Sequence, residues 1–512
     1  MDTIVSALHV IETEGPALGL NLNLAKCELF TPAVDNFDTR INYPGLGFVG
    51  FPDSLHLRST TPNFVLLGSP FGDLDFCAQH VAKLRSANNR LLDLFPKLQD
   101  TQVALHLMRN CSSFSKLVYV ARTTPPGLVH DSLRPCDDDT RVCFSTVAVL
   151  QLTDVAWRQA QLSLSNGGVG LRSTARHCAA AYIASHMAAL PGQRTATLDS
   201  ALLMYADMTE VAGSLPDAQV EEWLEKAPSQ NSLSVKLEKL DFDRILFSAD
   251  ATVTDRIRLT SVSASHSSAW LQALPCKGPI DLTLHPNEMQ VALQHRLGLP
   301  VAGPGDTCPL CTSRTLLDAA GHHHLTCSSK GFVTSRHNHI RDHLHNLCRS
   351  AGMNPKIEQG AVYGDQSRPA DLLVPLWSLG KAAAFDITVV SPLTPELIHG
   401  AGADGAVDAV AAAADRKHEA NDAKCDALGW QCVPLAVDSY GRWGVEAHKS
   451  FAQIATHIQT RNGGSLSAAY SSVYNTLGVV LTRHNARAVL ARRSNSELGA
   501  REVRLLGGVG LA

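Results

Sequence analysis

Apolar residues recur at helical spacing along most of the N-terminal half of the chain. After Asp73, apolar positions such as Val81 and Leu84 follow this spacing and predict a helix. A second helix is predicted at about residues 101–121, and residues 175–300 are expected to be mainly helical. The first half of the chain is therefore expected to be largely α-helical.

Short β-type runs mark two other regions. The run from Asn63 to Gly68 is apolar and ends in a glycine, which predicts a strand that closes in a turn. Residues 354–440 alternate such runs with one Ala-rich helix, predicted at residues 411–428. The last stretch, 444–512, is expected to be helical with a break at 463–465.

A glycine cluster follows a short amphipathic helix that begins near Asp154. Its members are Gly167, Gly168 and Gly170. A phosphate-binding loop requires a preceding strand, and none is predicted here. The cluster therefore predicts a tight structural turn with positive φ angles.

The composition is that of a globular protein with several domains. Of 512 residues, 45% are hydrophobic and 18% are charged, and at ~150 residues per domain about three or four units are expected. The formal net charge of -4 runs against a protein that grips nucleic acid, although the 22 histidines are counted as neutral. From Val301 the composition becomes rich in Gly, Pro, Cys and His, which indicates a separate module.

The sequence predicts neither a membrane span nor a secretory signal. It contains no run of about 18 apolar residues, and the start Met1-Asp2-Thr3 lacks the basic segment of a signal peptide. The 13 cysteines are scattered, so most are expected to be reduced thiols. The protein is therefore expected to be intracellular, with no membrane partner.

One group of residues has the spacing of a structural zinc site. Cys308 and Cys311 form a Cys-x2-Cys pair, and Cys327 follows a run of histidines. Zinc takes four such ligands in a tetrahedron, with sulfur at about 2.3 Å. His322 and His323 both have suitable spacing to Cys327, and we favour His323. Four protein ligands leave no open position, so this zinc is expected to be structural.

Two aspartates lie in neighbouring predicted strands. Asp371 stands at the entry of an apolar strand, and Asp386 is embedded in the next one, between Phe385 and Ile387. The intervening segment reads as a turn, so a hairpin can bring the carboxylates together. Paired carboxylates repel unless a divalent cation offsets their charge, and oxygen ligands suit magnesium. Both aspartates are therefore predicted to hold a catalytic Mg²⁺ that activates water for phosphodiester hydrolysis.

A lysine and a third acid complete the candidate catalytic set. Lys424 lies in the predicted helix 411–428 and is our candidate for stabilising the transition state. Lys417, two turns earlier on the same face, is the alternative. Glu358 can add a third acid from before the hairpin. Each residue taken alone also fits a solvated surface position, and only the set indicates a site.

The order of these C-terminal motifs resembles that of a known protein family. It runs through the Cys-x2-Cys pair, the His–Cys hairpin, the stretch Arg336–Asp342, Glu358, Arg368-Pro-x-Asp, Phe-Asp-Ile-Thr and a helical lysine. It resembles the restriction-like endonuclease end of site-specific non-LTR retrotransposon proteins, which have a PD-(D/E)xK nuclease fold. In the usual motif a lysine stands two residues after the second acid, where this chain has Thr388.

The resemblance also implies roles for further residues. Members of this group move the lysine to a following helix, which implies Lys424, with Lys417 as the alternative. Four residues in the same motifs are expected to contact nucleic acid: Arg336, His337, Arg341 and Arg368.

The N-terminal half resembles the same polyproteins. Residues 19–27 look like the reverse-transcriptase palm motif that follows the catalytic Asp-Asp hairpin, and Leu66-Leu67-Gly68 looks like the primer-gripping turn. Trp157-x-Gln159-Ala160 with the glycine cluster looks like the helical thumb. The Asp-Asp box would fall before Met1, so the chain is not expected to synthesise DNA.

The resemblance implies a multidomain α+β fold. Its units are a remnant of the reverse-transcriptase palm (1–75), a helical thumb and connector (76–300), a zinc knuckle (301–335), a restriction-like α/β endonuclease with a mixed central sheet (336–460) and a helical C-terminal tail (461–512).

The expected function is Mg²⁺-dependent nicking of DNA by one domain of a retrotransposon polyprotein that also carries a structural Zn²⁺. A DNA target and the RNA of the element are the expected partners, in the nucleus or cytoplasm. The sequence leaves the oligomeric state open. The alternatives are a nucleic-acid-binding module that does not cut, and a decayed remnant of an element.

Overall fold

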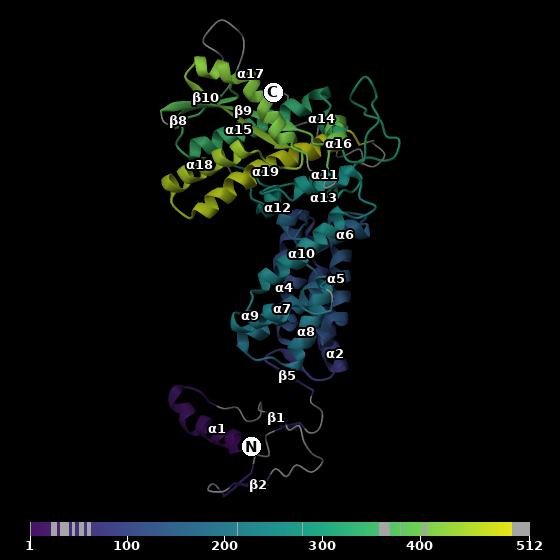
Figure 1. Cartoon of the computed structure of the whole chain (residues 1–512), viewed down its shortest axis with the longest axis vertical. Helices are drawn as coiled ribbons and strands as arrows, with labels where there is room; N and C mark the ends of the chain where they lie inside the picture. Colours follow the sequence, from purple (N-terminus) through teal and green to yellow (C-terminus); the bar gives the residue numbers. More distant parts are fainter. Residues whose placement is uncertain are drawn as a thin grey trace.

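The protein is a mostly helical α+β chain with one small mixed sheet in its C-terminal part (Figure 1). This computed structural model describes residues 2–21, 28–30, 40–43, 47–50, 56–58, 63–211, 213–278, 280–357, 369–378, 380–402 and 407–493. Within those ranges, no helix is both long and apolar enough to cross a membrane.

The N-terminal segment contains one helix and several short strands. Its elements are α1 (Asp2–Glu14), η1 (Gly15–Leu18), β1 (Glu28–Phe30), β2 (Arg40–Tyr43), β3 (Gly47–Gly50), β4 (His56–Arg58), β5 (Phe64–Leu66) and β6 (Ser69–Phe71). The predicted strand after Asn63 is β5, which pairs antiparallel with β6. Leu67 and Gly68 form the turn between them, both with positive φ. Residues 22–27 of the palm-like motif lie outside the described residues.

A body of helices follows, here called the helical body. It comprises α2 (Leu74–Leu92), η3 (Phe95–Leu98), α3 (Thr101–Cys111), α4 (Phe114–Thr123), α5 (Pro126–Ala148), α6 (Asp154–Gln161), η4 (Leu164–Asn166), α7 (Thr174–Ala189), α8 (Ala196–Met208), α9 (Asp217–Glu225), α10 (Gln230–Leu246), α11 (Val253–Val262), α12 (Ala269–Gln272) and α13 (Pro286–Leu297). Polar caps begin several of these helices. The carboxylate of Asp73 accepts the N–H of Phe76, and that of Asp100 accepts the N–H of Val103.

The glycine cluster forms the structural turn that its pattern predicts. Gly167 and Gly170 have positive φ angles. The turn is held by long polar side chains: Gln159 Nε2 donates to Gly167 O at 2.9 Å, and Arg296 Nε donates to Gly168 O at 3.0 Å. Arg296 is buried, so its guanidinium stabilises the turn from inside the helical body.

The remaining elements form a unit here called the sheet domain. It contains α14 (His322–Thr326), η5 (Ser329–Gly331), α15 (Phe332–Ser350), β7 (Lys356–Ile357), β8 (Leu372–Ser378), β9 (Lys381–Val390), α16 (Pro395–Gly400), α17 (Ala409–Ala427), β10 (Trp430–Asp438), α18 (Val445–Asn462) and α19 (Leu466–Leu490). The strand order is β10-β9-β8-β7. β10 runs parallel to β9, whereas β8 pairs antiparallel with both β9 and β7, so the sheet is mixed as expected.

The two faces of the sheet are covered differently. Alternate side chains such as Phe385, Leu435 and Leu372 form one apolar core with α15, α18 and α19. The opposite face carries Asp386 and Cys432 and lies under α17 (Figure 1). One face is therefore an apolar core, while the other holds a buried carboxylate and a buried thiol.

The last described helix is not a separate tail. α19 packs against α15 and α18 of the sheet domain and against α12 and α13 of the helical body. Its residues Val473 and Leu477 belong to the sheet core, and Val479 belongs to the core around Trp270. The expected helical tail is thus the element that joins the two units.

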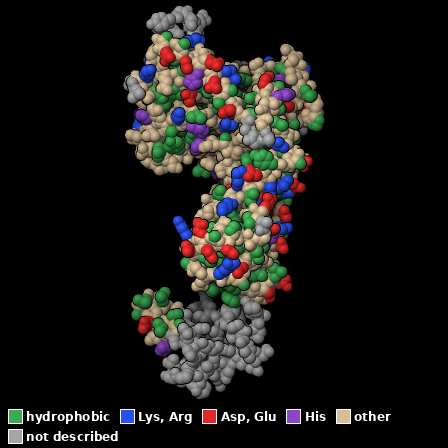
Figure 2. All heavy atoms as spheres, viewed as in Figure 1, with side chains coloured by type: hydrophobic (Ala, Val, Ile, Leu, Met, Phe, Trp, Pro, Cys, Tyr) green, Lys and Arg blue, Asp and Glu red, His purple; other side chains and the backbone are tan. Residues whose placement is uncertain are grey.

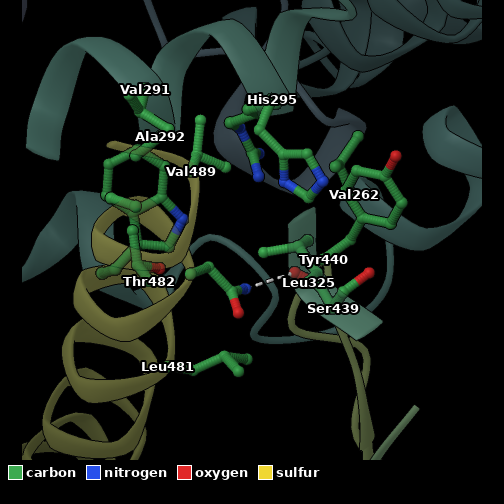
Figure 3. Close-up of a pocket in the computed structure, with 14 residues that line it drawn as sticks. Val262, Val291, Ala292, His295, Leu325, Ser439, Tyr440, Leu481, Thr482 and Val489 are labelled. Carbon is green, nitrogen blue, oxygen red and sulfur yellow. Dashed lines mark hydrogen bonds between the residues drawn. The ribbon is translucent and has the colours of Figure 1, made fainter. Parts of the chain in front are cut away.

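A small pocket lies where the two units meet (Figure 3). His295 of α13 stacks on Tyr440 with ring centroids 4.1 Å apart, and the Asn485 side chain donates to Ser439 O at 2.8 Å. Among the residues described around this pocket none is acidic or a cysteine, and apolar side chains predominate. The pocket is therefore lined mainly by side chains that pack the two units together.

Replacing Gly168 by alanine should destabilise the protein by about 3 kcal/mol. A Cβ there would overlap the carbonyl oxygen of Leu162 and lie 2.6 Å from Gln159 O. Chemical denaturation would measure the loss. Gly127→Ala is the matched control, because its Cβ would meet only Ser200 Oγ at 4.0 Å. Equal stability of the two variants would contradict this account of the turn.

Candidate functional site

The strand pairing brings Asp371 and Asp386 to the same place. In the antiparallel β8–β9 ladder Leu372 lies opposite Phe385. The preceding residue on one strand, Asp371, therefore lies beside the following residue on the other, Asp386. The Asp371 N–H donates to Phe385 O at 3.0 Å, and its carboxylate accepts the N–H of Ile387 at 2.8 Å. Asp371 thus holds the residues on both sides of Asp386, which fixes the two carboxylates as neighbours.

Asp386 is buried and carries two partners from α17. Lys417 Nζ donates to Asp386 Oδ1 at 2.8 Å, and Asn421 Nδ2 donates to Oδ2 at 2.7 Å. Burial, followed by the nearby Asp371 carboxylate, raises the pKa of Asp386 above its usual value although Lys417 opposes the shift. The carboxylate therefore depends on cationic and amide partners to stay ionised at this depth.

Asp371 is held in its ionised form by a histidine. His337 Nε2 of α15 lies 3.2 Å from Asp371 Oδ1. Burial favours the neutral acid, but the hydrogen bond and charge of His337 and the Ile387 N–H outweigh it and lower the pKa of Asp371. The neighbouring carboxyl groups thus have pKa values shifted in opposite directions, which is typical of functional carboxylate pairs.

The helix supplies Lys417 to this site. Lys417 contacts Asp386, whereas Lys424 is exposed at the end of α17. The preference for Lys424 is corrected in favour of its alternative, because Lys417 lies one turn before Asn421 and both reach Asp386. The sequence reasoning missed Asn421. Its spacing of four residues from Lys417, which puts both on one helix face, was the available signal.

The residues expected to contact nucleic acid are mostly engaged elsewhere. Arg336 is buried and donates to Asn485 Oδ1 at 2.7 Å and to Leu325 O at 3.1 Å. This corrects the expectation of a nucleic-acid contact for Arg336, because its guanidinium ties α15 to α19. Arg341 is held at 2.9 Å by its neighbour Asp342. His337 binds Asp371 as above, and the expected site residues Glu358 and Arg368 lie outside the described residues.

The surface of the helical body carries both positive and negative charge. On the face shown in Figure 2, Lys and Arg side chains are interspersed with Asp and Glu. Several of these charges form ion pairs, such as Arg176 with Asp241 at 2.8 Å and Arg85 with Asp139. Much of the basic charge on this body is therefore neutralised by acidic partners within the fold.

A second site brings together three cysteines and a histidine. The ligand atoms of Cys308, Cys311, His323 and Cys327 all lie within 4.8 Å of one another. Cys311 Sγ and His323 Nε2 are 3.7 Å apart. Such a Cys₃His group can bind zinc in a tetrahedral site. The choice of His323 over His322 is confirmed, because the ring of His322 bonds instead to Ser391 Oγ at 2.8 Å.

Local structure presents these four ligands. Thr307 and Leu316 form an antiparallel bridge, and Cys308 N donates to Thr315 O at 2.8 Å, so the Cys-x2-Cys pair lies in a tight hairpin. Asp318 accepts the backbone N–H groups of His322 and His323, both at 2.8 Å, and thereby starts the short helix that carries His323.

Two of the thiols have lowered pKa values, which favours the thiolate form that binds metal ions. Hydrogen bonds from Ser313 and then from the Thr315 backbone lower the pKa of Cys311 to about 5. Burial opposes ionisation of Cys327, but Ser329 and Arg492 outweigh it and lower its pKa to about 7. Because zinc binds thiolates, both shifts favour occupancy by a metal ion.

Comparison with known proteins does not identify the chain. No protein-family model matches it, and a search of curated proteins gives no match.

The adjacent histidines offer a matched test of the zinc site. His323→Asn should remove one tightly bound zinc per chain and lower the melting temperature, because one of four ligands is lost. His322→Asn should keep the zinc, since that ring bonds to Ser391. Metal content by mass spectrometry after dialysis against a chelator measures both. Loss of zinc from the His322 variant alone would overturn the ligand assignment.

Proposed function

We propose that the sheet domain is a metal-dependent endonuclease that nicks DNA. The observation that carries this proposal is the pairing of Asp371 with Asp386, with Lys417 Nζ 2.8 Å from Asp386 Oδ1. An acid from each of two adjacent strands and a nearby lysine are the groups that phosphodiester hydrolysis needs. The mixed sheet between helices is a scaffold of the kind that the PD-(D/E)xK resemblance implies.

The carboxylate pair is proposed to hold Mg²⁺. Both groups supply hard oxygen ligands, and the ion would offset the burial and the repulsion from Asp371 that raise the pKa of Asp386. Bound Mg²⁺ would supply a water of lowered pKa as the nucleophile and would neutralise charge on the phosphate. The part of Asp371 that faces solvent gives the ion and the scissile phosphate an approach, since its side chain is 24% exposed.

Three neighbouring side chains are proposed to assist the carboxylate pair in catalysis. Lys417 lies beside Asp386 and can move its ammonium group to the phosphate once a cation takes over the carboxylate. Asn421 and His337 act as positioning residues, because each fixes one carboxylate by a hydrogen bond. Thr388, two residues after Asp386 on the same strand, is neutral, so the positive charge comes from α17.

We further propose that this nuclease is part of a retrotransposon reverse transcriptase polyprotein. The zinc-ligand cluster lies next to the sheet domain, because His322 bonds to Ser391 just after β9. That position would let a zinc knuckle guide a DNA target or the element's RNA toward the carboxylates. Such a protein would act in the nucleus or cytoplasm.

A non-cutting, nucleic-acid-binding remnant is the second candidate. Both oxygens of Asp386 are already satisfied by Lys417 and Asn421. The carboxylate is therefore stable without a metal ion, as it would be in a protein that has lost its catalytic activity. Cleavage assays separate the two candidates.

The two lysines of α17 provide a matched cleavage test. Lys417→Met should reduce Mg²⁺-dependent nicking of supercoiled plasmid by about 10²–10³-fold, as for the loss of one transition-state donor. Lys424→Met should leave the rate within about twofold, since its exposed side chain removes no contact to the aspartates. Equal loss in both variants would contradict the assignment of Lys417.

Asp386→Asn separates catalysis from contamination and from binding. This variant should abolish nicking and also the rise in melting temperature that Mg²⁺ gives the wild-type protein, because the ion loses a charged ligand. Its affinity for a DNA duplex in EDTA should stay unchanged. Nicking that persists in Asp386→Asn would favour the non-cutting candidate and trace the activity to another protein.

A further inference from the structure

A second cluster of metal-binding side chains lies where α17 meets β10. His418, Asp422 and Cys425 are separated by four and three residues, so they share one face of α17. Gly429, with φ of +69°, turns the chain back into β10, where Cys432 follows. The helix–strand connection therefore places an imidazole, a carboxylate and two thiols together.

The distances in this cluster suit a single ion. One ligand atom each from His418, Asp422 and Cys432 lies within 4.8 Å of the other two, and the ligand atoms of the Cys₃His group also lie within this limit. His418 Nδ1 is 2.8 Å from Asp422 Oδ1. In a tetrahedral zinc site with bonds of about 2.0–2.3 Å, neighbouring ligand atoms lie about 3.3–3.8 Å apart. Adjustments of about 1 Å would complete the geometry.

A fourth ligand lies close to the third. Cys425 and Cys432 belong to one buried cluster between α17 and the sheet, so the Cys425 thiol lies close to the group of His418, Asp422 and Cys432. Two thiols, an imidazole and a carboxylate make a mixed S, N, O set, which suits zinc and not magnesium.

The imidazole also has an outer partner. His418 Nε2 lies 3.1 Å from Glu446 Oε2 at the start of α18. With Nδ1 directed at Asp422, an Nε2–H donated to Glu446 would fix the ring tautomer and orientation. A ligating histidine in a zinc site commonly makes this carboxylate contact.

We propose that His418, Asp422, Cys425 and Cys432 form a second zinc site that fastens α17 to β10. Binding would release the thiol protons, and any proton on His418 Nδ1, to solvent, leaving two thiolates and a neutral imidazole as ligands. With four protein ligands the ion has no open position, so it is structural. The site stands independently of DNA cleavage.

The position of the site has a consequence that rests on the proposed function. Lys417 and Asn421, which contact Asp386, lie on the strip of α17 next to His418 and Asp422. An ion that fixes the helix against β10 would also fix the distance from Lys417 to Asp386. Loss of this zinc should then lower nicking without touching either aspartate.

Counting metal ions in variants of the full chain tests the proposal. Under reducing conditions the wild type should hold about two tightly bound zinc ions per chain, and His323→Asn, which empties the Cys₃His group, about one. Adding Cys432→Ser to His323→Asn should leave none, whereas adding Cys276→Ser, an exposed cysteine outside both clusters, should change nothing. Replacing zinc by cobalt in His323→Asn should give thiolate charge-transfer absorption that Cys432→Ser abolishes.

Further variants keep the test decisive if Cys432→Ser fails to fold. His418→Asn and Asp422→Asn change partly exposed side chains and should each remove the second zinc. Glu446→Gln should retain it with about 10–100-fold lower affinity. If His323→Asn binds no zinc, or a thiol count shows Cys425 and Cys432 joined as a disulfide, the cluster is not a metal site. Because the readout is metal content, this failure is distinct from an absence of nicking.

Discussion

Two like charges on one face of the sheet, beside its inner strands, impose the main constraint on the C-terminal part of the protein. Asp371 and Asp386 are drawn together by the β8–β9 ladder, and Asp386 is buried. Two carboxylates at this depth are tolerated only with compensating partners. Lys417 and Asn421 from one side and His337 from the other provide them, so helices far apart in the sequence must converge on this point.

The sheet meets this constraint by separating its two faces. One face packs β8, β9 and β10 against α15, α18 and α19 and contains apolar side chains such as Phe385 and Leu435. The other face carries the buried acid and the thiol of Cys432, and Cys425 of α17 packs against this face. Period-two alternation along each strand makes this division possible, since it sends successive side chains to opposite faces. The apolar core thus supports the face that carries the buried carboxylate.

Buried arginines tie together segments that are far apart in the sequence. Arg336 connects α15 with α19, and Arg296 holds the glycine turn of the helical body. Arg492 donates to Cys327 O at 3.1 Å, which links the end of α19 to the zinc-ligand cluster. A guanidinium offers several donors in a fixed plane, so it can satisfy carbonyl groups of separate segments inside a core. These three buried arginines therefore stabilise the fold.

The sequence by itself determined the local features whose cause is local. It predicted the strand after Asn63, the glycine turn, the three cysteines of the Cys₃His group, and the hairpin that pairs Asp371 with Asp386, because spacing alone brings these groups together. Spacing left His322 and His323 both open as the fourth ligand, with His323 favoured. Only the tertiary structure decided that Lys417 and not Lys424 reaches Asp386, that Arg336 is internal, and that α19 completes a core. Those outcomes depend on how each helix is rotated and docked against its neighbours, which the hydrophobic period of the sequence does not determine. Lys417 and Lys424, for example, lie on the same face of one helix, so the period alone could not choose between them.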